Sequence, residues 1–254
     1  IKGAFLLSII MNVSALPLHP SVSILNHNKH GIVALEKPEG ILSHPNSKNE
    51  KKPALLNVPY DFEGEYYFWQ DTQGNDQKAW LLNRLDSPTS GVILIGLNQV
   101  IKDAVRVAFE KHTIKKIYYA IVKGRPRVVV GQWNQKLKQS SRTSKYKSPP
   151  KLAKTLYKLS STSSKNPQLS CLSLEPVTGR THQLRIHCSD NQLPIIGDQT
   201  YGDFKFNRQI KQSFGVNRLC LHSGSTSVSY NLNGRQHEFK AESAMPETFK
   251  QLMD

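Results

Sequence analysis

The sequence predicts an α+β protein whose central sheet is mixed and largely antiparallel, with flanking helices and loops. Three observations support this fold class. Many short runs of β-branched and aromatic residues end at Gly, Pro or Asn, as strands do. Few segments carry the periodicity of a helix, and strands and helices do not alternate regularly along the chain. At 254 residues the chain can also bury a substantial core, and no internal repeat is visible.

The first hundred residues are expected to hold three strands and one long loop. Residues Ile32–Leu35 are typical of a short buried strand, and a Pro-x-Gly turn follows them. Residues 46–79 are polar and mixed in composition, so we expect a loop with a short helical or irregular element there. Residues Leu81–Leu97 predict a strand, a turn and a second strand, because turn-forming residues interrupt an apolar run.

A helix and a further strand are expected next. Residues Asn98–His112 predict an amphipathic helix, because apolar side chains recur at turn spacing on one face, at Val100, Ala104, Val107 and Ala108. Residues 115–126 alternate between two faces and are rich in β-branched and aromatic side chains. That pattern predicts a strand, which closes at a Gly and a Pro.

The rest of the chain begins with a strongly basic segment. Residues 135–158 carry eight Lys or Arg and no acid, which leaves two interpretations: a solvated, partly disordered segment, or a hairpin or loop that contacts phosphates. Residues 169–187 contain two strand-like runs around a Thr-Gly turn. From Arg218 onward the pattern predicts further strands, and residues 246–254 predict a short terminal helix.

The charge balance favours a polyanionic partner. Lys and Arg number 34 against 19 Asp and Glu, which gives a net charge of +15. Each phosphate that a basic side chain neutralises releases condensed counterions, so nucleic acid is the leading partner. An anionic membrane surface, or a basic surface kept only for solubility, are the alternatives.

Cysteine usage and the first residues bear on the compartment. The three cysteines form no C-x-x-C, so we expect neither a disulfide framework nor a zinc site, but a reducing, cytoplasmic setting. Residues 1–20 resemble a signal peptide only weakly, and we expect an N-terminal extension or a strand packed on the domain. Their apolar run is too short to span a bilayer, so no membrane partner is expected.

Motifs for common cofactors and metals do not occur in the chain. There is no G-x-G-x-x-G, no G-x-x-x-x-G-K-[ST], no H-E-x-x-H and no EF-hand loop. His182 and His187 lie five residues apart and would point to opposite faces of a strand, which argues against a metal pair. Neither a cofactor nor a metal is therefore expected.

Three places carry candidate chemistry, and each also has a purely structural interpretation. Asp86, two residues after Arg84, is either a turn residue or a nucleophilic carboxylate, whose ionised form a neighbouring cation favours. Arg185 is either a surface residue or a buried cation that must pair with an acid or a phosphate. Tyr118, one of two adjacent tyrosines in a strand, either belongs to the core or stacks on a nucleobase.

Six motifs add a family resemblance to these candidates. They are "VALEKPEGILSHP", "RLDSPTSG", "KIYYAIVKG", "TGRTHQLRIH", "PIIGDQTYG" and "RLCLHS", in this order along the chain. Together they resemble the RluA-type pseudouridine synthases, which isomerise uridine in ribosomal or transfer RNA. The resemblance runs from about Ser21 to the C-terminus. It implies the pseudouridine synthase fold, with an active-site cleft across the sheet.

The resemblance also implies a role for each matching residue. Asp86 matches the nucleophile, Tyr118 the tyrosine that stacks on the base and assists proton removal, and Arg185 the arginine that pairs with the nucleophile. Arg84 matches the arginine that fills the gap left by the flipped uridine. The rest of the implied substrate-binding set is Arg180, His182, Gln183, Leu184 and Ile186.

The chain departs from the family pattern in a few positions. Asn83 stands where the family usually has His, which bears on RNA contact or packing and hence on the substrate rather than the reaction. Glu36 replaces the usual Asp or Asn, and Ser223 replaces Ala. Many members carry a small N-terminal RNA-binding domain, but here we expect an extension over residues 1–20 and one catalytic domain over residues 21–254.

The implied activity is the isomerisation of specific uridines in structured RNA, by base flipping and attack of an aspartate. The expected partner is transfer or ribosomal RNA, and the expected state is a monomer without metal or cofactor. Two rivals are a non-catalytic RNA-binding or chaperone protein and a DNA-binding module, although no helix-turn-helix, zinc-finger or basic-zipper pattern occurs. The choice of RNA is expected to depend on residues 135–158 and 204–214.

Overall fold

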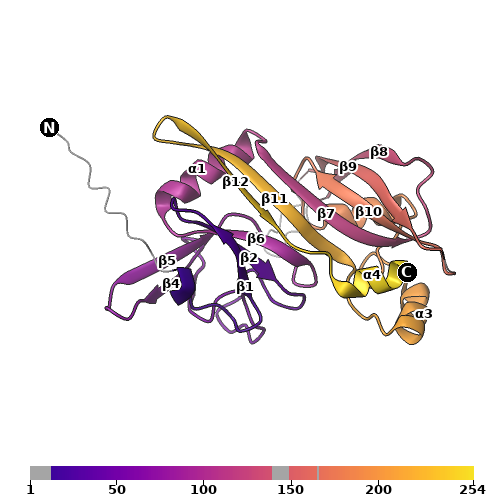
Figure 1. Ribbon diagram of the computed structural model, residues 1–254, viewed down its shortest axis with the longest axis horizontal. Coiled ribbons are helices and arrows are strands. Elements are labelled where there is room, and N and C mark those ends of the chain that lie inside the picture. The colour runs from indigo at the N-terminus through magenta and orange to yellow at the C-terminus, as the bar shows by residue number, and fades with distance from the viewer. Residues whose placement is uncertain (1–12, 139–148, 165) are drawn as a thin grey trace.

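The computed structural model describes residues 13–138, 149–164 and 166–254, and its strands form one sheet with helices packed against it (Figure 1). The described strands are β1 (Ser23–His27), β2 (Ile32–Lys37), β3 (Tyr60–Asp61), β4 (Tyr66–Gln70), β5 (Asp76–Leu81), β6 (Ser90–Gly96), β7 (Ile114–Lys123), β8 (Val130–Leu137), β9 (Lys151–Thr162), β10 (Leu169–Pro176), β11 (Leu221–Leu232) and β12 (Arg235–Glu242). The described helices are the 3-10 helix η1 (Val13–Ala15) and the α-helices α1 (Gln99–Glu110), α2 (Gln183–Asp190), α3 (Phe204–Phe214) and α4 (Glu247–Met253).

The sheet consists of two halves that meet at its centre. Its order is β3-β4-β5-β6-β11-β7-β10-β9-β8, and β2 pairs with β6, β1 with β2 and β12 with β11. The strand pairs are antiparallel except for β6 with β11, which is parallel. The mixed, largely antiparallel sheet predicted from the sequence is therefore confirmed.

The parallel pairing of β6 with β11 depends on a glycine. Gly91 lies opposite Ser223, and its φ of 107° falls in the region that favours glycine. A Cβ at this position would stand 2.2 Å from the backbone oxygen of Ser223. The glycine that closes the "TSG" stretch therefore lets the two halves of the sheet approach each other beside the loop that carries Asp86.

The central strands are buried on both faces. In β6, Ile93 and Ile95 face the larger hydrophobic core, whereas Val92 and Leu94 face a smaller core on the other side. Helix α1 covers the smaller core together with β11 and β12, and α2 packs against β9 and β10. This layering explains why the apolar run after Asp86 is almost continuous instead of alternating.

The predicted helix at residues 98–112 is confirmed, but only part of its predicted buried face, Ala104 and Ala108, packs on the core. Ile101, Val105 and Ala108 face the core, while Val100 and Val107 are 61% and 40% exposed. The helix carries apolar side chains on two sides, so the spacing of apolar residues in the sequence does not determine which side packs on the sheet. The stripe at i, i+4 and i+7 that includes Ile101 is the one that packs.

The long loop expected over residues 46–79 is wrong in its second half. Strands β3, β4 and β5 occupy much of it, and a turn closed by Asp71 joins β4 to β5. The sequence looks loop-like because these strands lie at the edge of the sheet, where one face meets solvent. Tyr67 and Ala79 are buried between polar or exposed neighbours, whereas Phe68 is exposed.

The second strand-like run expected in residues 169–187 is also wrong. The first run forms β10, but the residues after the Thr-Gly turn form α2. Its buried side chains include Gln183, Leu184, His187 and Cys188, which recur at helical spacing. Because two of the four are polar, a purely hydrophobic pattern did not reveal the helix.

The basic segment and the C-terminal region agree with expectation where the structure describes them. Strands β8 and β9 form an antiparallel hairpin, and residues 139–148 between them lie outside the described residues. Strands β11 and β12 and helix α4 match the strands and terminal helix expected after Arg218.

Part of the N-terminal segment packs on the sheet. Residues 1–12 lie outside the described residues, whereas Leu16 is buried in the larger core. The backbone of His19 donates to Leu55 O, and Asn57 donates to Pro17 O. Among the described residues, no helix is long and apolar enough to cross a membrane.

Candidate active site

A short loop between β5 and β6 places Asp86 where the two halves of the sheet meet. The Oγ of Ser43 donates to Leu85 O at 2.8 Å and accepts from Leu85 N at 3.1 Å. The N–H of Thr89 donates to Asp86 O at 2.9 Å, which closes a turn just before β6. The backbone of Asp86 is thereby fixed on both of its sides.

A buried lysine at the end of β2 holds the loop that carries Asp86. Lys37 is 0% exposed, and its Nζ donates to Pro38 O, Ile41 O and Ser87 O at 2.9, 2.8 and 2.9 Å. These three carbonyls match the three N–H donors of an ammonium group. Because Ser87 follows Asp86, Lys37 ties the end of β2 to the loop that carries the carboxylate.

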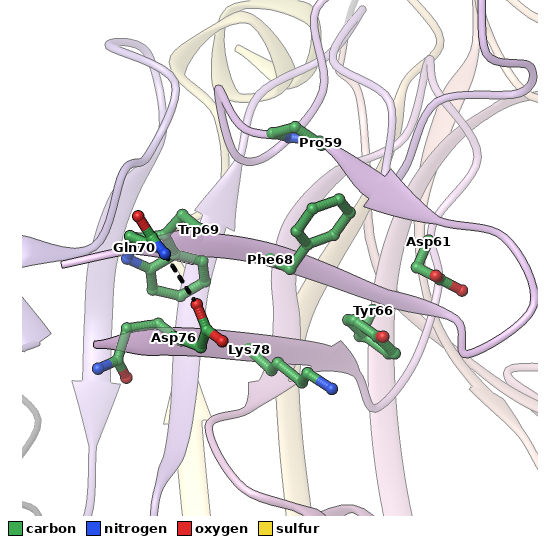
Figure 2. A pocket seen from close by; sticks show the side chains of 9 residues that line it. Pro59, Asp61, Tyr66, Phe68, Trp69, Gln70, Asp76 and Lys78 are labelled. Carbon is green, nitrogen blue, oxygen red and sulfur yellow. Dashed lines mark hydrogen bonds between the residues drawn. The ribbon is translucent and has the colours of Figure 1, made fainter. Parts of the chain in front are cut away.

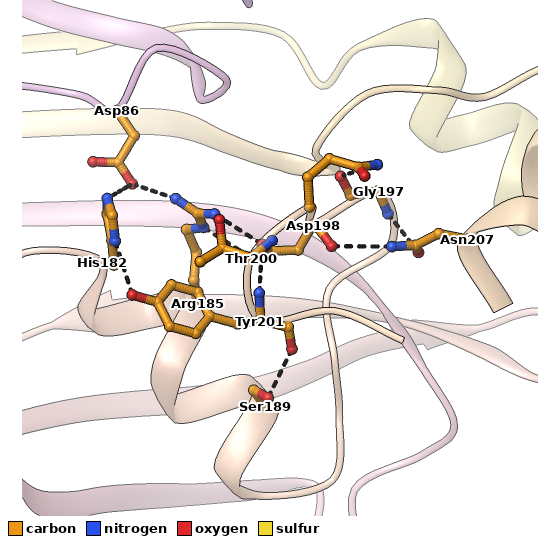
Figure 3. A network of polar contacts seen from close by, with 10 residues as sticks. Asp86, His182, Arg185, Ser189, Gly197, Asp198, Thr200, Tyr201 and Asn207 are labelled. Carbon is orange, nitrogen blue, oxygen red and sulfur yellow. Dashed lines mark hydrogen bonds and ion pairs between the residues drawn. The ribbon is translucent and has the colours of Figure 1, made fainter. Parts of the chain in front are cut away.

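The side chain of Asp86 faces two basic groups from α2 and the turn before it. Its Oδ2 lies 3.2 Å from a terminal nitrogen of Arg185 and 3.7 Å from Nε2 of His182 (Figure 3). Asp86 is 29% exposed and Arg185 only 6%, so the carboxylate is open to solvent on one side and backed by a buried cation. The structure therefore brings Asp86 together with two residues that follow it by about a hundred positions.

A second carboxylate fixes the direction of Arg185. Its Nε and Nη2 donate to the two oxygens of Asp198 at 2.7 and 2.8 Å, which leaves Nη1 to face Asp86. Asp198 is 1% exposed and also accepts from the backbone N–H groups of Thr200 and Tyr201. A bidentate pair of this kind fixes the plane of the guanidinium as well as its position.

The charges of this pair are stable in the buried setting. Burial acts to raise the pKa of Asp198, but hydrogen bonds from Arg185 and from the backbone of Tyr201 and Thr200 outweigh it and hold that pKa below its usual range. Burial likewise opposes the charge of Arg185, but Asp198 and Asp86 outweigh it and raise its pKa. Both groups are therefore ionised at neutral pH.

His182 is oriented by the segment that also holds Asp198. Its backbone is left-handed, with φ 54°, just before α2 begins. Its Nδ1 lies 3.0 Å from the hydroxyl of Tyr201, whose ring sits under the guanidinium of Arg185 at 5.2 Å. Tyr201 and Asp198 thus position the two basic groups that face Asp86.

Asp198 and Tyr201 were missed by the residue-level reasoning on the sequence. Both lie in "PIIGDQTYG", a stretch that contributed to the family resemblance but received no role. A buried arginine needs an acidic partner to neutralise its charge. The acid in this matched stretch is the signal that could have identified Asp198.

Tyr118 lies on β7 and is largely buried. Its side chain is 7% exposed, and it belongs to the larger core. Burial, with a smaller contribution from the charge of Asp86, raises the pKa of Tyr118 to about 12. Its phenol is therefore neutral at physiological pH, and stacking on a base stays a prediction.

The other predicted binding residues are divided between support and surface. Gln183 is 4% exposed and donates to Lys154 O and Thr155 Oγ1 at 2.9 and 3.0 Å, so it holds α2 on β9. Leu184 is buried in the larger core, and Ile186 is half-buried.

Two predicted arginines contact other parts of the chain. The Nε of Arg180 donates to Leu152 O at 3.3 Å, toward the β8–β9 hairpin. Arg84 is exposed beside His44.

One concavity lies away from this centre. It measures about 420 Å³ and lies on the β4–β5 hairpin (Figure 2). None of the predicted site residues lines it. Among the described residues, no group of three or more His, Cys, Asp or Glu side chains is arranged to hold a metal ion.

A mixed sheet that carries an Asp–Arg–Asp chain at its centre, in a strongly basic protein, fits an enzyme that acts on a polyanion. Comparison with known proteins specifies which one. Residues 31–190 match the family described as RNA pseudouridylate synthase. The chain therefore belongs to the RNA pseudouridylate synthase family, and it is an enzyme that isomerises uridine in RNA.

Named relatives and solved structures agree with this family. The chain is 31% identical over 227 residues to a tRNA pseudouridine synthase C of Yersinia pestis, covering 84% of this chain and 83% of that protein. It is 31% identical over 217 residues to a ribosomal large subunit pseudouridine synthase C of Rickettsia felis, covering 83% and 67%. The fold resembles human RNA pseudouridylate synthase domain containing 4, with a TM-score of 0.63, 19% identity and 90% coverage of each chain.

Proposed function

We propose that the chain converts specific uridines to pseudouridine in transfer or ribosomal RNA, with Asp86 as the nucleophile. The observation that carries this assignment is the contact of Asp86 with Arg185, whose direction Asp198 fixes. The names of the relatives, which refer to transfer RNA and to the large ribosomal subunit, support the choice of substrate class.

The site requires a uridine that has left its base stack. Asp86 lies at the junction of β6 and β11 and is only 29% exposed, so a base held within a duplex could not reach it. Flipping costs a few kcal/mol in lost stacking and pairing. Contacts between the basic surface and the RNA backbone offset that cost, and Arg84 fills the gap in the stack.

The isomerisation exchanges the bond between the sugar and N1 of uracil for a bond between the sugar and C5, and moves one proton from C5 to N1. The carboxylate of Asp86 attacks either the uracil ring or the anomeric carbon of the sugar, and the bond between the sugar and N1 breaks. The uracil turns, C5 bonds to the anomeric carbon, Asp86 is released, and the proton on C5 leaves as N1 gains one. Arg185 aims the carboxylate and offers a fixed positive charge.

Tyr118 is assigned to stacking on the flipped base. A phenol with a pKa of about 12 is neutral at physiological pH and is a poor proton acceptor in the resting enzyme. Its ring offers a flat apolar face beside Asp86, which any pyrimidine can use. Leu184 and Ile186 complete the apolar side of the pocket. Arg180 and His182 are assigned to the RNA-binding region around it, and buried Gln183 supports that region by holding α2 on β9.

We further propose that residues 21–254 act as one catalytic domain, preceded by an extension over residues 1–20. The continuous pairing from β1 to β12 supports a single unit. We propose a monomer that works in the cytoplasm, without a metal or an organic cofactor.

Tritium release tests the proposal directly. Transfer and ribosomal RNA transcripts that carry tritium at C5 of uridine are incubated with the protein, and label in the water is counted. The wild type is expected to release label from one RNA class, while Asp86→Asn releases none and still binds the RNA. Near-normal release by Asp86→Asn would remove the residue from this role. Binding without release by the wild type would favour the non-catalytic RNA-binding alternative.

A further inference from the structure

Two aromatic rings form a parallel stack close to the loop of Asp86. The rings of His44 and Tyr60 have centroids 4.9 Å apart and planes only 12° apart. Nδ1 of His44 lies 2.8 Å from Pro45 O, which holds the imidazole in this orientation. Both side chains are half-buried, so the pair is held by the protein and still reaches the surface.

Arg84 connects this stack to the active site. Within the described residues its guanidinium has one hydrogen-bond partner, Nε2 of His44 at 3.4 Å. Arg84 precedes Asp86 by two positions, so one short loop carries both the partner of His44 and the reacting carboxylate. When Arg84 enters the RNA stack, as proposed above, it must leave His44, and the edge of the imidazole is then open.

The surroundings of the stack are apolar and acidic. Phe62, 37% exposed, packs its edge against Tyr60 at 5.4 Å, and Asp61, Glu63 and Glu65 lie in the same turn. Burial and the charge of Glu65 raise the pKa of Tyr60 to about 12, so the ring is neutral. Three carboxylates repel the RNA backbone, whereas an aromatic face attracts any base.

We propose that His44, backed by Tyr60, is a stacking subsite for the nucleobase next to the extruded uridine. The ligand is an unpaired base, not a phosphate, and the subsite rests on the function proposed above. The acidic turn keeps the phosphates away, so the base points inward and the RNA backbone turns away from the β3–β4 edge. The subsite is suited to RNA in which the target lies in a loop or bulge, because a paired neighbour could not turn its face to the imidazole.

Three substitutions at position 44 separate stacking from the contact with Arg84. His44→Ala removes both, His44→Gln keeps an acceptor for Arg84 without a ring, and His44→Phe keeps a ring without the acceptor. Phe68→Ala is the matched control. Phe68 is a 41% exposed aromatic residue on the β3–β4 hairpin that carries Tyr60. It follows Tyr67, which contacts Tyr60, so its side chain points to the opposite face of the strand.

The measurements are the KM and kcat of tritium release, and the Kd of the same transfer and ribosomal RNA transcripts. His44→Ala and His44→Gln are expected to raise KM and Kd about 5- to 100-fold with little change in kcat, as loss of one base stack does. His44→Phe and Phe68→Ala are expected to stay near the wild type. The slope of log Kd against log salt is expected to be unchanged, because no phosphate contact is lost.

Other outcomes overturn the subsite. Unchanged KM and Kd in His44→Ala would show that no base rests there. Rescue by His44→Gln but not by His44→Phe would make His44 a holder of Arg84, and a smaller salt slope would make it a phosphate contact. The Kd readout tests the subsite even if the wild type releases no tritium, so its failure is distinct from failure of the proposed function.

Discussion

The buried centre around Asp86 and the β8–β9 hairpin use charge in opposite ways. At the centre, Arg185 and Asp198 are 6% and 1% exposed, and each finds its partner within 3.2 Å. On the described part of the hairpin, Lys136, Lys151 and Lys158 are exposed, Lys154 is half-buried, and neither strand contains an acid. Buried pairs depend on geometry and resist salt, whereas exposed charges act over distance and are screened by it. The contrast predicts that changes at the centre alter turnover, and changes on the hairpin alter binding.

The largest effect is expected from breaking the buried pair. Asp198→Asn removes the charge that fixes Arg185, so Arg185 turns away from Asp86 and kcat falls about 100-fold while KM changes little. The loss should be nearly independent of salt concentration, because the pair is shielded from solvent. Single-turnover tritium release at two salt concentrations measures both quantities.

Asp203→Asn is the matched control for that variant. Asp203 lies five residues further on, is 34% exposed, and pairs with Lys123 at 2.7 Å. Asn can still cap α3 as Asp203 does, so turnover should stay within about twofold of the wild type. Equal losses of kcat in Asp198→Asn and Asp203→Asn would mean that any change in this segment harms the enzyme. Asp198 would then have no specific role in aiming Arg185.

The centre also depends on a buried neutral histidine at the β6–β11 junction. His222 is 1% exposed, and its two ring nitrogens lie 2.8 and 2.9 Å from the hydroxyls of Ser90 and Ser243. Burial, aided by the charge of Arg218, lowers the pKa of His222 to about 4. The unfolded chain takes up this proton near pH 6.5, so the contribution to stability is complete above that pH and is lost as the pH falls toward 4.

The expected size of this loss is about 3 kcal/mol in the free energy of unfolding at pH 4. Urea unfolding of the wild type and of His222→Gln at pH 7, 5.5 and 4 measures it. The variant is expected to be less stable at pH 7 but to lose about 3 kcal/mol less on acidification. Parallel stability curves for the two proteins would show that His222 does not titrate as the burial implies.

The contrast between local motifs and distant partners explains what the sequence could predict about the site. Asp86, Tyr118 and Arg185 belong to local motifs, so their roles were open to inference from short stretches of residues. The pair of Arg185 with Asp198 spans 13 positions and two different elements, and only the packing of the turn before α3 against α2 creates it. The contact of Arg84 with His44 spans 40 positions and is equally invisible to a local pattern.

The secondary structure predicted from the sequence is wrong at α2 and at β3 to β5 for a similar reason. Helix α2 buries Gln183, Arg185 and His187, each of which contacts a polar partner on another element or turn, and no hydrophobic pattern reports such contacts. Strands β3 to β5 leave one face in solvent, so their composition resembles that of a loop. Local motifs therefore predicted which residues belong to the site, while the partners of these residues depended on the fold.

The smallest effect is expected on the hairpin, and it should appear in binding alone. Lys154 and Lys158 lie four residues apart on one face of β9, opposite the face that Ala153, Thr155 and Tyr157 bury. The double variant Lys154→Ala/Lys158→Ala removes both charges, so it should raise KM about 10-fold at moderate salt and leave kcat unchanged. The slope of log Kd against log salt should fall by about 2, because each lost phosphate contact lowers it by about 1. At high salt the variant and the wild type should converge, because the lost contacts are already screened. A fall in kcat would contradict the division between a centre for turnover and a hairpin for binding, because the lysines would then act on the centre through α2, which packs against β9. An unchanged salt slope would show that these lysines do not contact phosphates.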